Sequence, residues 1–340
     1  MSKPLLPAWL VAFAAAGLAG AGPARAESIR DISPSQVIEL GRQGPVDKVP
    51  VISSVALDPQ GKLLATVGDD HLVRIWDARG GQLMRRLAGH RDWVRAVAFS
   101  PSGAVLATAG NDRSIYLWEV TGTSPYRVVA EQVPGICTLA FSPDGSLLAV
   151  GGFENRVRVY HAGTGELVHA LPTPGGDIRA LAFSPDAKLL SAAGHGDQIR
   201  VWNTANGEAI YDLVGHRLRV SALAYSLDGS QLASGGDQRN VWIWDTATGK
   251  PLALLPARPG KILSLAYCGP NHLAVGSSDN LVRVWEVTAR KEVARLVGHT
   301  GSVSTLAWDA SSGVVISGSF DTTARIWQLK LSGASVISNR

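Results

Sequence analysis

Residues 89–119 read GHRDWVRAVAFSPSGAVLATAGNDRSIYLWE, and the rest of the chain repeats this unit with variations. Aligning the repeats on the aromatic residue near the end of the unit places Trp76, Trp118, Tyr160, Trp202, Trp244, Trp285 and Trp327 at intervals of 42, 42, 42, 42, 41 and 42 residues. A constant period of this length is typical of a closed array of repeats. The sequence therefore predicts one domain made of seven repeats rather than two unrelated domains.

Each repeat is predicted to contain four short strands. Residues 93–99 and 104–109 are apolar and β-branched, and they flank a Ser-Pro-Ser-Gly sequence that suits a type I turn. A third strand covers residues 114–118, and a fourth follows the aligned Trp, as in residues 82–87. Apolar residues occupy both alternating sets of strand positions, so both faces of each sheet need cover. Neighbouring sheets can supply it in a ring, which predicts an all-β, seven-bladed β-propeller of four-stranded antiparallel blades.

The count of fourth strands predicts how the ring closes. Only six of them lie between the aligned positions, so the repeat ending at Trp327 lacks one. Residues 36–40 (QVIEL) resemble residues 292–296 (EVARL), which form such a strand in the preceding repeat. We therefore expect an N-terminal strand near residues 36–41 to complete the last blade and remove an exposed edge. The propeller would span residues 36–329, with a flexible segment at 27–35 and a C-terminal tail at 330–340.

Residues 1–26 have the pattern of a signal peptide. Lys3 precedes an apolar run from Leu5 to about Gly22, and Ala24-Arg25-Ala26 provides an A-x-A cleavage site. This pattern predicts cleavage near Ala26, a periplasmic or secreted protein and no transmembrane segment afterwards. An uncleaved membrane anchor is the alternative, because about 18 apolar residues are borderline for spanning a bilayer.

Charge and cysteine content narrow the class of protein further. Removing residues 1–26 leaves 30 basic and 28 acidic residues, a net charge of +2, which does not favour nucleic-acid binding. Cys137 and Cys268 are the only cysteines, and they fall three repeats apart. Repeats three apart in a ring of seven lie almost opposite each other, beyond the reach of a disulfide. We therefore expect two free thiols.

Several repeats resemble the WD-repeat family. The resemblance is carried by Gly89-His90, Asp112 and Trp118-Glu119, with Trp76-Asp77 and Trp244-Asp245, and it covers roughly residues 36–329. It implies a propeller that binds other proteins and is not an enzyme, with no cofactor, although the family shares no single partner. A chain of this kind is expected to be monomeric on its own.

Two repeats contain a hydroxyl, an imidazole and a carboxylate that superficially resemble a nucleophilic triad. The family resemblance instead implies that each set forms a buried hydrogen-bond network with the aligned Trp, which ties the strands together. The two complete networks would comprise His90, Thr108, Asp112 and Trp118, and His299, Ser317, Asp321 and Trp327. Other repeats keep only parts of this set, and Gln238 replaces the acid beside His216 and Ser234.

No other catalytic or metal-binding pattern is present. The chain contains no G-x-S-x-G, H-E-x-x-H, P-loop or C-x-x-C motif. His195 and Asp197 lie close in one turn, but two ligands do not make a metal site, and a solvated loop is the simpler interpretation.

The positions that vary between repeats are the candidates for partner binding. The family pattern implies that three positions per repeat face one rim of the propeller: the third residue after the His position, the residue two further on, and the residue before the Asp position. Candidates at these positions are Trp93, Arg95, Phe153, Asp177, Arg179, His195, Arg219, Asp237, Lys261 and Phe320. Trp and Arg are common interface hot spots, although an exposed Trp beside an Arg is also explained by a cation-π pair without a partner.

These observations favour a non-enzymatic scaffold or recognition module that binds another protein of the cell envelope through one rim. The alternative is a small-ligand-binding or hydrolytic propeller that uses a central channel. Its polar groups would be Asp177, Arg179, His195 and Arg219, although no motif requires it.

Overall fold

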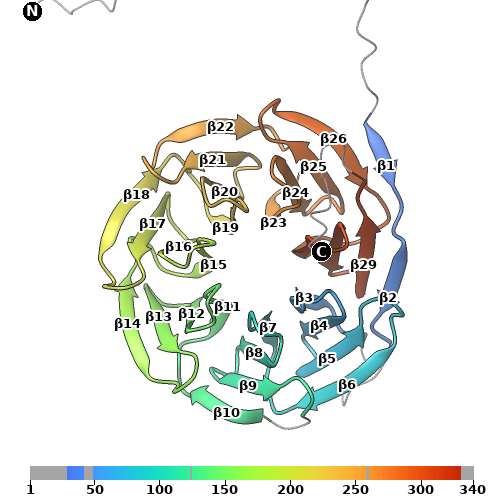
Figure 1. Ribbon diagram of the computed structural model, residues 1–340, viewed down its shortest axis with the longest axis vertical. Helices are drawn as coiled ribbons and strands as arrows, with labels where there is room; N and C mark the ends of the chain where they lie inside the picture. The colour runs from blue at the N-terminus through green and yellow to red at the C-terminus, as the bar shows by residue number, and fades with distance from the viewer. Residues whose placement is uncertain (1–28, 42–48, 123–124, 258–259, 331–340) are drawn as a thin grey trace, which may run out of the picture.

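The structure is a computed structural model that describes residues 29–41, 49–122, 125–257 and 260–330. Within these ranges every regular element is a β-strand, and the strands form seven small sheets around a ring (Figure 1). The four strands that make up each blade pair antiparallel, as in the blade formed by residues 136–172. The predicted all-β, seven-bladed propeller is therefore confirmed.

Each blade runs outward from the ring axis in chain order, and the connections alternate between the two faces of the ring. Blade 1 contains β3 (Ile52–Leu57), β4 (Leu63–Gly68), β5 (Leu72–Asp77) and β6 (Leu83–Ala88). Blade 2 contains β7 (Val94–Phe99), β8 (Val105–Gly110), β9 (Ile115–Glu119) and β10 (Pro125–Ala130). Blade 3 contains β11 (Ile136–Phe141), β12 (Leu147–Gly152), β13 (Arg156–His161) and β14 (Leu167–Pro172). Blade 4 contains β15 (Ile178–Phe183), β16 (Leu189–Gly194), β17 (Gln198–Asn203) and β18 (Ala209–Val214).

The last three blades follow the same plan. Blade 5 contains β19 (Val220–Tyr225), β20 (Gln231–Gly236), β21 (Val241–Asp245) and β22 (Pro251–Leu255). Blade 6 contains β23 (Ile262–Tyr267), β24 (His272–Ser277), β25 (Val282–Glu286) and β26 (Lys291–Leu296). Blade 7 contains β27 (Val303–Asp309), β28 (Val314–Ser319) and β29 (Thr323–Gln328), and it takes its outer strand from β2 (Gln36–Glu39).

The turn after each inner strand has a specific backbone requirement. In blade 2 the Gly103 N–H donates to the carbonyl of Ser100 at 2.9 Å, and Gly103 has a φ of 74°. Glycine adopts this left-handed region without steric cost, which explains its place in the Ser-Pro-Ser-Gly turn. Blade 4 has Ala187 at the same position with a φ of 60°, so the turn geometry holds even where glycine is absent.

Apolar packing between adjacent blades forms the core. One cluster joins Val67, Val73 and Ile75 of blade 1 to Val97 and Phe99 of blade 2. Equivalent clusters span the other neighbouring pairs, including blades 7 and 1. Both faces of each sheet are therefore buried, as the apolar residues at both sets of alternating positions indicated.

The N-terminal strand closes the ring without a covalent bond. β2 pairs antiparallel with β29, and Gln36 lies opposite Ile326. Ile38 and Leu40 are 3% and 1% exposed in the cluster that joins blades 7 and 1. The predicted closing strand near residues 36–41 is confirmed.

The segment before this strand differs from the expectation. Residues 27–35 were expected to be flexible, but β1 (Arg30–Ile32) pairs in parallel with β26 and adds a fifth strand to blade 6. The Val297 N–H also donates to the carbonyl of Ile32 at 2.9 Å. β26 offered an unpaired edge within reach of the chain that leads into β2, and pairing satisfies its backbone groups. The expected signal peptide at 1–26 lies outside the described residues, as does all of the 330–340 tail except Lys330.

Blades 2 and 7 contain the hydrogen-bond networks that the family resemblance implied. In blade 2 the Asp112 carboxylate lies 2.8 Å from Nδ1 of His90, and the Thr108 hydroxyl lies 2.7 Å from Nε2. The Trp118 indole N–H donates to the same hydroxyl at 2.7 Å. In blade 7 the matching distances are 2.8, 2.7 and 2.7 Å, and they join His299, Asp321, Ser317 and Trp327.

The carboxylates of these networks are stabilised in their charged form. Burial raises the pKa of Asp112, but hydrogen bonds from His90 and from the backbone of Arg91 and Ser114 outweigh it, so the pKa lies below its usual value. Burial also raises the pKa of Asp321, but hydrogen bonds from His299, Thr323 and the backbone of Thr300 outweigh it and lower the pKa. The His90 and His299 side chains have no exposed surface, so neither set is open to a substrate.

Arginine takes the place of the missing histidine in three other blades, a pairing that was not predicted from the sequence. Each arginine lies four residues after the acid: Arg74 pairs with Asp70 at 2.5 Å, Arg158 with Glu154 at 2.8 Å and Arg283 with Asp279 at 2.6 Å. Arg74 is only 1% exposed, and a buried arginine requires such a partner. The sequence contained a pattern that could have predicted this pairing, because an acid is followed by an arginine four residues later in each of the three repeats. This spacing places the acid in the turn before the third strand and the arginine on that strand.

Blade 5 has a histidine without a carboxylate. Nε2 of His216 lies 2.7 Å from the Ser234 hydroxyl, and Nδ1 has no hydrogen-bond partner among the described residues. His216 is 2% exposed, and burial lowers its pKa to about 4. The folded imidazole is therefore neutral above about pH 4.

The two cysteines are free, as predicted. Cys137 lies on β11 of blade 3 and Cys268 directly follows β23 of blade 6. Cys268 is fully buried, whereas Cys137 is partly exposed.

Ring closure predicts a large effect for a small substitution. Ile38→Ala should lower the free energy of unfolding by about 2–4 kcal/mol, because it opens a cavity in the seam between blades 7 and 1. Val37→Ala is the control, because Val37 lies on the same strand but is 40% exposed. Urea unfolding measures the difference. The midpoints of Ile38→Ala and Val37→Ala would coincide if the buried face of β2 contributed nothing to stability.

His90→Ala should destabilise the protein by about 2–4 kcal/mol, because it leaves Asp112 buried without its main partner. His161→Ala, at an exposed position, should cost less than about 1 kcal/mol. Thermal unfolding of the two variants measures the difference, and equal melting temperatures would contradict a stabilising network.

The lowered pKa of His216 predicts a specific pH dependence. The unfolded histidine binds a proton near pH 6.5 but the folded one only near pH 4, so stability falls as pH drops through this window. Between pH 7 and 4.5 the free energy of unfolding should fall about 2 kcal/mol further in wild type than in His216→Gln. His195→Gln, at an exposed position, is the control and should follow wild type. Urea unfolding at several pH values measures these free energies. If His216 were protonated as readily in the folded state as in the unfolded state, the free energies of wild type and His216→Gln would change in parallel with pH.

Candidate functional site

The ten candidate binding residues lie on one face of the ring. Val94, the first residue of β7, pairs with Gly110, the last residue of β8, so both strand ends reach the same face. Trp93 precedes β7, Arg95 is its second residue and Asn111 follows β8. The other candidates occupy the same three positions in blades 3 to 7, and we call this side the rim face.

A cation-π pair and a hydrogen bond hold the candidates of blade 2. The Arg95 guanidinium lies 3.8 Å from the centre of the Trp93 ring. Its Nε–H donates to the side-chain oxygen of Asn111 at 3.0 Å. A second pair crosses between blades, because the Arg179 guanidinium of blade 4 lies 4.9 Å from the Phe153 ring of blade 3. Two arginines are therefore held against aromatic rings on the rim face.

Asp177 links blades 4 and 5. Its carboxylate lies 2.8 Å from Nε of Arg179 and 3.6 Å from a terminal nitrogen of Arg219. All three side chains are partly buried. We refer to Trp93, Arg95, Cys137, Phe153, Asp177, Arg179 and Arg219 as the rim arc, because they extend over the adjacent blades 2 to 5.

Cys137 lies near the centre of the rim arc. It is the second residue of β11, the position held by Arg95 on β7 and by Arg179 on β15. Burial raises the pKa of its thiol, while the positive charges of Arg179, Arg95 and Arg219 oppose this rise. The pKa of Arg95 is lowered by burial, and the charge of Arg179 adds to this effect. All three guanidinium groups therefore act electrostatically on one small region.

The remaining candidates lie outside this arc. Lys261 pairs with Asp237 at 3.3 Å, and Lys261 is 51% exposed, so this surface pair contributes little. His195 is exposed, and its side chain forms no hydrogen bond or ion pair with the described residues. Phe320 is 46% exposed on blade 7. Leu218, which precedes Arg219, is 53% exposed and adds apolar surface. It does not occupy any of the three rim positions of its repeat.

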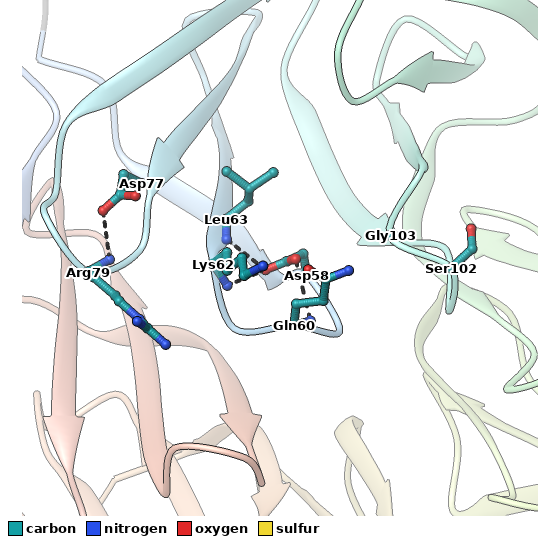
Figure 2. Close-up of a pocket in the computed structure, with 8 residues that line it drawn as sticks. All are labelled: Asp58, Gln60, Lys62, Leu63, Asp77, Arg79, Ser102 and Gly103. Carbon is teal, nitrogen blue, oxygen red and sulfur yellow. Dashed lines mark hydrogen bonds between the residues drawn. The ribbon is translucent and has the colours of Figure 1, made fainter.

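A cavity of about 500 Å³ lies on the opposite face, between blades 1 and 2 (Figure 2). It is lined by the turns after β3, β5 and β7 and includes Asp58, Lys62, Asp77 and Arg79. The Asp58 carboxylate accepts the backbone N–H groups of Lys62 and Leu63 at 2.6 Å, and Asp77 accepts that of Arg79 at 3.1 Å. Both carboxylates therefore stabilise their own turns, and the cavity contains no paired nucleophile and base.

Two kinds of site are absent from the described part of the chain. It contains no group of three or more His, Cys, Asp or Glu side chains placed to bind a metal ion. Over the same residues, no helix of sufficient length and apolar character to cross a bilayer is present.

The sequence matches known proteins repeat by repeat. The family described as "WD domain, G-beta repeat" matches residues 43–77, 81–119, 125–161, 165–203, 207–245, 249–286 and 290–328. A probable serine/threonine-protein kinase PkwA of Thermomonospora curvata is 46% identical over 43 residues, which are 13% of this chain and 6% of that protein. An uncharacterized WD repeat-containing protein, alr2800, of Nostoc sp. is 46% identical over 44 residues, which are 13% of this chain and 4% of that protein.

These two relatives share about one repeat with the chain and are far longer than the matched region. They therefore support the nature of the repeat and not a shared activity. The seven family matches extend over most of the chain, and from the second match on each contains the outer strand of one blade and the three inner strands of the next. WD-repeat propellers typically act as non-enzymatic scaffolds for protein interactions. The protein belongs to the WD-repeat family.

Proposed function

We propose that the protein is a non-enzymatic recognition or scaffold module of the cell envelope that binds another protein through the rim arc. The observation that carries this proposal is that four adjacent blades present aromatic and arginine side chains on one face, with contacts inside blade 2, between blades 3 and 4 and between blades 4 and 5. Such residues supply a large share of the binding energy at protein interfaces.

The contacts within the arc support binding without a large ordering cost. Arg95 is held by Trp93 and Asn111, and Arg179 by Phe153 and Asp177. Side chains already fixed in position lose less conformational entropy on association than free ones. The inner strands that carry them contact one another around the ring, which keeps the blades in fixed relation.

Export is part of the proposal and rests on residues 1–26. Their apolar run and A-x-A end favour cleavage near Ala26 and a periplasmic or secreted location. A partner would then be another envelope or secreted protein, with the propeller acting as a monomer. In the alternative, a hydrolytic site at the ring axis, Asp177 would have to act as a free carboxylate, but it already pairs with Arg179 and Arg219.

Co-purification from cell envelopes tests the rim site. The double variant Trp93→Ala, Arg219→Ala should retain a partner at least about tenfold less well than wild type, because two hot-spot side chains are removed. Quantitative mass spectrometry of the captured proteins measures the loss.

A matched double variant on the opposite face is the control. Arg79→Ala, Leu227→Ala also removes one exposed arginine and one exposed apolar side chain, and Leu227 is 50% exposed in the turn after β19. It should retain the partner as wild type does. Equal retention by all three proteins would reject the rim arc as the binding site.

A further inference from the structure

The rim arc has an uncompensated positive charge. It contains Arg95, Arg179 and Arg219 but a single carboxylate, that of Asp177. Asp177 already pairs with both Arg179 and Arg219. No described carboxylate lies within 4.0 Å of the Arg95 guanidinium, whose only hydrogen bond goes to the neutral Asn111. Asp92, which precedes Trp93, also acts electrostatically on Arg95, so the three arginines exceed the two nearby carboxylates by one positive charge.

Hydrogen-bond donors in the arc are also left without acceptors. Nε of Arg219 and Nε1 of Trp93 are buried and have no partner among the described residues. Buried donors are normally satisfied, so each unpaired donor leaves stabilisation that a suitable acceptor could supply.

The surroundings of these charges show what kind of anion would fit. Phe153 is 50% exposed beside Arg179, so an apolar surface adjoins the positive charges. Asp177 would repel a doubly charged phosphate more strongly than a singly charged carboxylate. The arc is also short, with no basic stripe of the kind that follows a nucleic-acid backbone. These features favour the carboxylate of a protein side chain, whose planar shape matches a guanidinium group.

We propose that the rim arc recognises an acidic residue of the partner, whose carboxylate lies among Arg95, Arg179 and Arg219 while a neighbouring apolar side chain contacts Phe153. This inference rests on the proposed function, because it names the chemistry that the same surface would select. The incoming carboxylate supplies the missing negative charge and additional hydrogen-bond acceptors.

A random dodecapeptide display library selected on the full chain tests this inference. Wild type should enrich peptides in which Asp or Glu adjoins an apolar residue. The enriched peptide should bind about tenfold more weakly when its acid is changed to Asn or Gln, as expected for loss of a charge-assisted hydrogen bond. Its affinity should also decrease as salt concentration increases.

Two double variants on the same face separate the arc from general positive charge. Arg95→Gln, Arg219→Gln should lose the acidic peptides, and Arg113→Gln, Arg239→Gln should keep them. The control removes two exposed arginines from turns of the same blades 2 and 5. Circular dichroism and thermal unfolding confirm that both variants are folded.

Three results would overturn the inference. They are enrichment of neutral or basic peptides, equal binding of acidic peptides by both double variants, and no enrichment at all. Enriched peptides that depend on Trp93 and Phe153 but contain no acid would overturn it while leaving the rim as a protein-binding site. Failure of the proposed function itself appears separately, as unchanged co-purification in the Trp93→Ala, Arg219→Ala variant.

Discussion

Packing of each blade against both of its neighbours is the constraint on which the structure depends. A four-stranded sheet with apolar residues on both faces cannot be stable alone in water, and the next sheet provides the cover. The clusters that join blades 1 and 2, and blades 7 and 1, show this cover on two sides of one blade. The last face is covered only when the ring closes, so β2 has a role far larger than its four residues suggest.

Within this frame, the polar bracing of the blades varies widely. Blades 2 and 7 use a histidine between a carboxylate and a hydroxyl, whereas blades 1, 3 and 6 pair the carboxylate with an arginine four residues later. Both solutions give a buried acid a charged or hydrogen-bonding partner, which is what burial of a carboxylate demands. Blade 6 also leaves the Trp285 indole N–H without a partner among the described residues, because Val275 replaces the hydroxyl. A ring held mainly by apolar contacts tolerates such losses.

Tolerance of this kind leaves the rim positions available for recognition. The same three positions carry Trp93, Arg95 and Asn111 in blade 2 but Lys261, Leu263 and Ser278 in blade 6. Because the strands fix where each side chain starts, a substitution at these positions changes the surface and leaves the blade intact. The rim arc thus concentrates aromatic and arginine side chains on blades 2 to 5, and the contacts among them hold their geometry.

The sequence by itself determined the number of blades, the order of strands, the closing strand and the two free thiols, because each follows from a repeat period or a strand position. The resemblance to the WD-repeat family implied that the candidate residues share one face, and the strand ends in the structure lie on that face. Only the tertiary structure decided which candidates meet. The link from Asp177 to Arg219 and the contact of Arg179 with Phe153 join different blades, and their distances depend on how the blades pack. The pairing of β1 with β26 was also decided there, because three residues carry no periodic signal and the free edge exists only in the folded ring.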